Sequence, residues 1–276
     1  MSAGDPGDRL ARAFARARAE GRPALLPFFP VCWPERDATQ EIVRAAVEGG
    51  ADAIEFGFPF SDPLADGVTN QRAYEEAIAN GATLERLFAA SADLRAQDVR
   101  VPFLIMGYFN PLLAYGAGRF VRDAAEAGID GLIVVDLPPE EAAEFQALAR
   151  AAGLHVVYLL APTSTDERIA RVARAASGFI YCVSVAGVTG LRAELPPALP
   201  ELIGRVRART DVPLVVGFGI SAARHVREVG RIADGAAVGS AFVEVIREAP
   251  RERRAERVRE FVRGIAGRDP AAPGAD

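Results

Sequence analysis

Hydrophobic and polar positions alternate in blocks along most of this 276-residue chain. Short apolar runs are separated by longer stretches rich in Ala, Arg and Glu, whose apolar positions recur at helical spacing. The runs predict strands at residues 24–29, 53–56, 102–106, 131–135, 155–159, 178–183, 213–216 and 235–238. The stretches predict helices at residues 40–48, 83–96, 119–127, 140–152, 165–176, 199–209, 222–229 and 241–248. Eight strands, each followed by a helix, are the units of a (β/α)₈ barrel.

Further patterns favour an α/β fold built as a single TIM barrel with an extra N-terminal helix at residues 9–18. Asp52, Asp130 and Asp234 recur just before predicted strands, as in a repeated unit. A doubly wound open sheet is the competing fold, but the segment 30–34 after the first strand lacks its glycine fingerprint. We expect one domain over residues 1–266 and a disordered tail over residues 267–276, where small, polar and proline residues gather.

The amino-acid composition excludes some catalytic and phosphate-binding mechanisms. All 32 basic residues counted as Lys or Arg are arginines, because the sequence contains no lysine. Schiff-base catalysis and a Walker-type phosphate loop are therefore excluded, and any phosphate must be bound by arginines or backbone N–H groups. A net charge of −5 indicates no nucleic-acid surface.

Localisation and metal content also follow from composition. No apolar stretch has the length of a membrane span, so we expect no membrane partner. The widely separated Cys32 and Cys182 favour a reducing cytoplasm. The isolated His155 and His225 give no metal-ligand spacing, so we expect no metal.

The second predicted strand contains a carboxylate within an apolar run, Glu55, and leads into the acidic loop 58–67. Burial away from any arginine would keep Glu55 protonated, as a general acid requires. Asp66, on the loop, would close over a ligand and keep its charge. In the alternative interpretation, Glu55 is paired with an arginine of a neighbouring strand, and Asp62 and Asp66 only cap turns.

Three glycine-rich turns follow the last three predicted strands, at residues 187–190, 217–219 and 239–240. In barrels of this kind the late loops and the N-terminus of a helix bind phosphate. Ser240 is the expected cap of a helix that begins at Ala241. Such a site needs no lysine. Phe28, Tyr181 and Phe218 are candidates for the walls of a slot for a flat apolar ligand, or else core residues at the mouth of the barrel.

The segment 58–67 (FPFSDPLADG), preceded by Glu55 and followed by Gln71, closely resembles the signature of the tryptophan synthase alpha subunit family. The turns GVTG, GFGIS and GSA, together with Tyr108, Asn110 and Asp136, are similar to the same family over about residues 9–264. The resemblance implies retro-aldol cleavage of indole-3-glycerol phosphate to indole and D-glyceraldehyde 3-phosphate, in L-tryptophan biosynthesis. It implies that the reaction uses neither a metal nor an organic cofactor. It also implies a beta subunit as partner in an alpha2-beta2 assembly.

By the same resemblance, Glu55 protonates indole C3 and takes the proton of the glycerol hydroxyl, while Asp66 binds the indole N–H. The residues implied in substrate binding are Phe28, Tyr108, Ile133, Tyr181, Thr189 and Phe218. The residues implied in phosphate binding are Gly190, Gly219, Gly239 and Ser240.

Three places depart from the family pattern: the segment 30–34, Val68 and Val185. They fall on loops that the family uses for closure and for communication with the beta subunit, whereas Pro59, Asp62 and Asn110 of the usual partner face are retained. Two alternatives therefore stay open beside an alpha subunit. One is a stand-alone lyase that releases free indole, and the other is a catalytically weak allosteric partner of a beta subunit.

Overall fold

The computed structural model describes residues 8–183, 196–217 and 219–267. Its eight strands are β1 (Ala24–Pro30), β2 (Ile54–Gly57), β3 (Phe103–Gly107), β4 (Gly131–Val134), β5 (His155–Leu160), β6 (Ile180–Val183), β7 (Leu214–Gly217) and β8 (Gly235–Val238). Each strand pairs in parallel with the next, and β8 returns to β1 through the pair Ala24 and Gly235, so the sheet is closed. The predicted (β/α)₈ barrel is confirmed.

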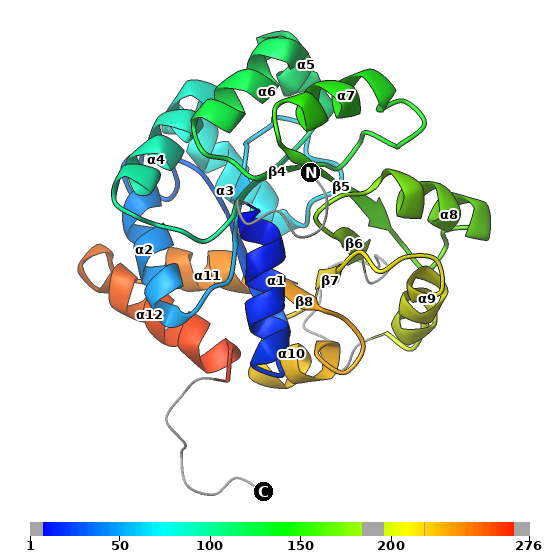
Figure 1. The fold of residues 1–276 in the computed structure, drawn as a ribbon. Coiled ribbons are helices and arrows are strands. Elements are labelled where there is room, and N and C mark those ends of the chain that lie inside the picture. Colours follow the sequence, from blue (N-terminus) through cyan, green and yellow to red (C-terminus); the bar gives the residue numbers. More distant parts are fainter. Residues whose placement is uncertain (1–7, 184–195, 218, 268–276) are drawn as a thin grey trace, which may run out of the picture.

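The helices lie outside the sheet, and all of them except α1 form a ring around it (Figure 1). They are α1 (Arg9–Ala19), α2 (Thr39–Gly49), α3 (Val68–Ala79), α4 (Leu84–Ala96), α5 (Phe109–Tyr115), α6 (Ala117–Glu126), α7 (Ala143–Ala151), α8 (Asp166–Ala175), α9 (Ala198–Arg207), α10 (Ala223–Val229), α11 (Ser240–Glu248) and α12 (Arg254–Ile265), with a 3₁₀ turn η1 (Arg251–Arg253). The sequence pattern did not predict α3 and α5. Helix α3 buries only Ala73, Tyr74 and Ala77, and the seven-residue α5 buries only Leu112, so neither has a strong apolar stripe.

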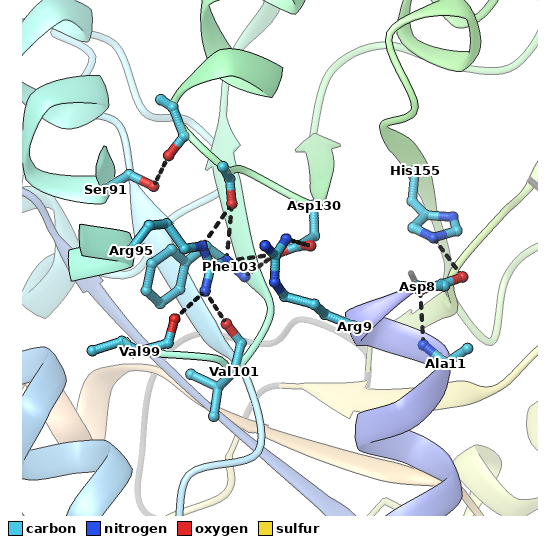
Figure 2. Close-up of polar contacts among 12 residues, drawn as sticks. Asp8, Arg9, Ala11, Ser91, Arg95, Val99, Val101, Phe103, Asp130 and His155 are labelled. Carbon is cyan, nitrogen blue, oxygen red and sulfur yellow. Dashed lines mark hydrogen bonds and ion pairs between the residues drawn. The ribbon is translucent and has the colours of Figure 1, made fainter. Parts of the chain in front are cut away.

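The predicted N-terminal helix, α1, lies across the N-terminal end of the barrel (Figure 1). Its Phe14 meets Phe179, which directly precedes β6, edge to face at 5.9 Å between centroids. Asp8 caps the helix by accepting the N–H of Ala11 at 2.9 Å, and its other oxygen lies 3.1 Å from Nε2 of His155 on β5 (Figure 2). Helix α1 is therefore fixed to the barrel by both apolar and polar contacts.

The repeated aspartates connect neighbouring strands at the N-terminal end of the barrel. Each accepts an N–H from the strand before its own: Leu25 to Asp52 at 2.9 Å, Phe103 to Asp130 at 2.8 Å and Leu214 to Asp234 at 2.9 Å. Each is also ion-paired with two arginines: Asp52 with Arg16 and Arg22, Asp130 with Arg9 and Arg95, and Asp234 with Arg18 and Arg207. Figure 2 shows the Asp130 cluster. This end of the barrel is structural, so the loops at the opposite end are the place for a site.

Candidate active site

Glu55 lies in the middle of β2 and is completely buried. Both of its carboxyl oxygens lack a hydrogen-bond partner among the described residues, so no arginine of that part of the chain pairs with it. Burial alone raises the pKa of Glu55 to about 8. The alternative that Glu55 is a paired structural carboxylate is therefore wrong for the described chain. At neutral pH Glu55 holds a proton that it can give up, which suits an acid that must also act as a base.

Asp66 ends the acidic loop after β2 and lies, partly buried, next to Tyr108. The hydroxyl of Tyr108 donates to Oδ2 of Asp66 at 2.7 Å, and the amide of Asn70 donates to Oδ1 at 3.3 Å. Burial raises the pKa of Asp66, and these two hydrogen bonds act in the opposite direction. Tyr108 also accepts the N–H of Ala65 at 3.0 Å, so one side chain after β3 holds the loop. Asp66 is therefore more than the turn cap of the alternative interpretation.

Helix α3 supplies three polar residues to this region. Asn70 contacts Asp66 as described, and Gln71 donates to the backbone oxygen of Asp66 at 2.9 Å. Tyr74 is buried, and its hydroxyl has no hydrogen-bond partner in the described chain. Asn70 and Tyr74 were missed from the sequence because α3 itself was not predicted. Asn70 and Tyr74 are four positions apart, which is the spacing of side chains on one face of a helix, but this signal is visible only once a helix from Val68 is assumed.

The described residues expected to line an indole slot, Phe28, Tyr108, Ile133 and Tyr181, are all buried. Phe28 is the register partner of Glu55 across the β1–β2 pair, so the ring and the carboxyl group are neighbours. Tyr181 lies against Gly217, where a Cβ atom would come within 2.2 Å of the ring, so glycine is required there. Phe218 lies outside the described residues.

The expected phosphate site is described only in part. Gly239 directly follows β8 and Ser240 begins α11, so the helix starts one residue earlier than predicted and Gly239 is its cap. Ser240 is the first residue of α11 rather than its cap, so the expectation that it is the cap is wrong. Ser240 is exposed, and the first N–H groups of α11 lack intrahelical acceptors and favour an anion. Gly219 follows β7 with a φ of +77°, which favours glycine. Thr189 and Gly190 lie outside the described residues.

The unusual segment after β1 is tightly packed. Trp33 is fully buried, and its indole N–H donates to Oε2 of Glu76 on α3 at 2.6 Å. Arg247 of α11 donates to Oε1 of the same carboxylate at 2.6 Å. Asn80, directly after α3, donates to the backbone oxygens of Cys32 and Pro34 at 3.0 and 2.8 Å. The segment after β1 therefore contacts α3 through Trp33, and α3 in turn contacts α11 through Glu76 and Arg247.

The described ranges offer neither a metal site nor a membrane-spanning helix. They contain no group of three or more His, Cys, Asp or Glu side chains arranged to hold a metal ion. None of their helices is long and apolar enough to cross a membrane.

A closed (β/α)₈ barrel with carboxylates, aromatic rings and a helix N-terminus at the C-terminal ends of its strands has the design of a TIM-barrel enzyme. A family model described as tryptophan synthase alpha chain matches residues 14–267. The tryptophan synthase alpha chain of Roseiflexus sp. (strain RS-1) is 54% identical over 259 residues, which cover 94% of this chain and 99% of that protein. That of Chloroflexus aurantiacus is 49% identical over 257 residues, which cover 93% and 97%.

Solved structures of tryptophan synthase are also similar to this chain. Mycobacterium tuberculosis tryptophan synthase, crystallised in space group F222, superposes with a TM-score of 0.87 at 38% identity, covering 94% of this chain and 97% of that one. Tryptophan synthase subunit alpha from Legionella pneumophila gives 0.86 at 32% identity, covering 95% and 98%. The chain belongs to the tryptophan synthase alpha chain family. Its family makes it a lyase of tryptophan biosynthesis.

Proposed function

We propose that this chain cleaves indole-3-glycerol phosphate to indole and D-glyceraldehyde 3-phosphate, as the alpha subunit of a tryptophan synthase. The observation that carries the proposal is the state of Glu55, which is fully buried, without a hydrogen-bond partner in the described chain, and has a pKa of about 8. Such a carboxyl group both delivers and accepts a proton near neutral pH. Family membership supports the substrate.

The reaction needs two proton movements and one charge sink. Glu55 gives its proton to C3 of the indole ring, which places positive charge on the ring nitrogen. The carboxylate so formed takes the proton of the hydroxyl group on the adjacent chain carbon. The two electrons of the O–H bond then form the C=O bond of the aldehyde. At the same time the bond between indole C3 and the chain carbon breaks, and its two electrons restore the double bond of the ring and neutralise the nitrogen. Asp66 accepts the indole N–H and stabilises the cation, and the hydrogen bond from Tyr108 holds its carboxylate in place.

Binding of the two ends of the substrate follows the same geometry. Phe28, Tyr108, Ile133 and Tyr181 would enclose the indole ring, with Phe218 added from outside the described chain. Gly219, Gly239, Ser240 and, again outside it, Gly190 would bind the phosphate through N–H groups and one hydroxyl, with Thr189 closing against Asp66. This design requires no lysine, and the proposed reaction uses neither a metal nor an organic cofactor.

The family generally works with a beta subunit, and we propose an alpha2-beta2 assembly in the cytoplasm for this chain. Large apolar side chains are exposed at Leu64, Val68 and Leu113, on the loop before α3, on α3 and on α5. Asp62 and Asn110 are exposed on the same segments. Exposed apolar side chains rimmed by polar ones are typical of a protein-binding face.

Release of indole from indole-3-glycerol phosphate by the purified chain tests the proposal. The assay is run with and without a tryptophan synthase beta subunit. Slow release that the beta subunit stimulates strongly is the expected result. Fast release without stimulation would instead favour a stand-alone lyase, and no release under either condition would contradict the lyase function.

A further inference from the structure

Helix α3 carries two buried polar atoms that the proposed mechanism leaves without a role. The hydroxyl of Tyr74 and the side-chain oxygen of Asn70 each lack a hydrogen-bond partner within the described ranges. The two residues are four positions apart and therefore lie on one face of the helix. Buried polar atoms without partners are rare because they cost free energy, and two on one helix face indicate a bound polar group.

Tyr74 occupies space inside the barrel that Gly57 leaves open. Gly57 follows Glu55 by two positions on β2, so a side chain there would point the same way as that of Glu55. A Cβ atom at Gly57 would lie 3.0 Å from Cε1 of Tyr74 and 2.7 Å from Cζ of Phe28. The rings of Tyr74 and Phe28 meet edge to face, with centroids 6.2 Å apart. Tyr74 therefore lies one layer beyond Glu55, beside a wall of the proposed indole slot.

Asn70 extends the same face toward the proposed phosphate site. Its Nδ2 atom donates to Asp66 at 3.3 Å and lies 3.8 Å from the place where a Cβ atom of Gly239 would be. Gly239 is the cap of α11. The face of α3 thus runs from Glu55, past Asp66, to the N-terminus of α11.

The hydroxyl of Tyr74 is chemically suited to bind a neutral polar group. Burial raises the pKa of Tyr74 well above its ordinary value, and the nearby charge of Asp66 raises it further. The hydroxyl therefore stays protonated at neutral pH, and it can both donate and accept a hydrogen bond.

We propose that Tyr74 binds a hydroxyl group of the three-carbon chain that joins the indole ring to the phosphate. This inference rests on the proposed function. Glu55 acts at the indole end of the three-carbon linker of the substrate, and Gly239 lies at its phosphate end. The linker therefore passes along the face of α3 on which Tyr74 lies. A buried hydroxyl that is left without a hydrogen bond costs free energy, so the site should bind a ligand whose linker has no hydroxyl group less well.

The variant Tyr74→Phe tests this role with two ligands. One is indole-3-glycerol phosphate, and the other is 3-(indol-3-yl)propyl phosphate, which has the same ring, chain length and phosphate but no hydroxyl group. Loss of one neutral hydrogen bond is expected to lower kcat/KM for the first ligand about three- to tenfold. The Kd of the second ligand, measured by calorimetry, is expected to stay at the wild-type value.

Tyr158→Phe is the matched control, because the hydroxyl of Tyr158 on β5 is also buried without a partner in the described chain. It feels the charges of Arg150 and Glu140 rather than those of the site, and we expect no change with either ligand. Equal weakening of both ligands by Tyr74→Phe, or of neither, would overturn the inference. A wild-type chain that binds the ligands without releasing indole would refute the proposed cleavage instead. The inference is then judged on the Kd values of the two ligands alone.

Discussion

At the scale of single residues, two buried carboxylates only three positions apart show how the surroundings decide their chemistry. Asp52 and Glu55 are both fully buried. Burial raises the pKa of each, but in Asp52 hydrogen bonds from Arg22, the Leu25 N–H and Arg16 outweigh it and lower the pKa. Among the described residues Glu55 has no such partner, and its pKa rises from 4.5 to about 8. One carboxylate is therefore a structural anion, and the other is an acid ready to exchange its proton.

The raised pKa of Glu55 predicts a pH-dependent loss of stability. Between its unfolded pKa of 4.5 and its folded pKa of about 8, the unfolded chain releases this proton more readily than the folded chain. The free energy of unfolding contributed by Glu55 therefore falls as the pH rises through this window and levels off above it. Urea unfolding of Glu55→Gln is expected to lack this slope, so the variant gains stability over wild type from pH 5 to pH 8. A difference that does not change with pH would contradict the assignment.

Tyr108 gives a second prediction at this scale. Tyr108→Phe removes the 2.7 Å hydrogen bond that lowers the pKa of Asp66. The pKa of Asp66 then rises, so the acidic limb of the kcat/KM profile should move to higher pH, with a loss of about tenfold or less at its maximum. Tyr115→Phe is the control, because Tyr115 donates to Asp123 at the same 2.7 Å on the outer helices. An unshifted acidic limb in Tyr108→Phe would show that Tyr108 does not act through Asp66.

At the scale of elements, the N-terminal ends of the strands are held by aspartates and the C-terminal ends are left for the site. The Asp52, Asp130 and Asp234 carboxylates each join a strand start to two arginines. Helix α1 covers this end, and its cap Asp8 reaches His155 on β5 (Figure 2). Rigidity at one end supports loops that must hold carboxylates and phosphate groups at the other.

Asp52→Asn is expected to lower the free energy of unfolding by about 1.5–3 kcal/mol, because it leaves the partly buried Arg22 with only the more exposed Glu20 as a counter-charge. Urea unfolding at pH 7 measures the loss. Asp166→Asn is the control, since Asp166 is exposed and its bond to Arg205 at 2.7 Å is solvated. A loss for Asp52→Asn no larger than that for the control would refute the structural role of the repeat.

The same carboxylates predict acid sensitivity. Burial would raise the pKa of Asp8, Asp52 and Asp234, but their hydrogen bonds and ion pairs lower it below the ordinary 3.8. A group with a depressed folded pKa stabilises the protein above its unfolded pKa and loses that contribution as the pH falls through the folded value. We therefore expect the free energy of unfolding to drop below about pH 4. Urea titrations at pH 3, 4 and 6 check this, and a flat profile would contradict it.

At the scale of the whole molecule, strand periodicity was enough to predict the barrel, because eight apolar runs and their spacing leave few alternatives. Glu55 stood out in the sequence as a lone carboxylate in an apolar run, but only the structure decided between an unpaired acid and a partner of an arginine. Helix α3 was not predicted, because it buries only small residues and one tyrosine, and Asn70 and Tyr74 were missed with it. The start of α11 was misplaced by one residue, because Gly239 and Ser240 are both acceptable caps and only the fold decides between them.

In the proposed cleavage of indole-3-glycerol phosphate, Glu55 carries the proton, so replacing its carboxyl group should affect turnover but not binding. Indole release and the Kd of 3-(indol-3-yl)propyl phosphate are measured for wild type and Glu55→Gln under the same conditions, in the presence of a beta subunit. We expect Glu55→Gln to lower kcat by about 10²–10⁴-fold while the Kd stays nearly unchanged. Turnover at the wild-type rate in Glu55→Gln would show that Glu55 does not carry the proton.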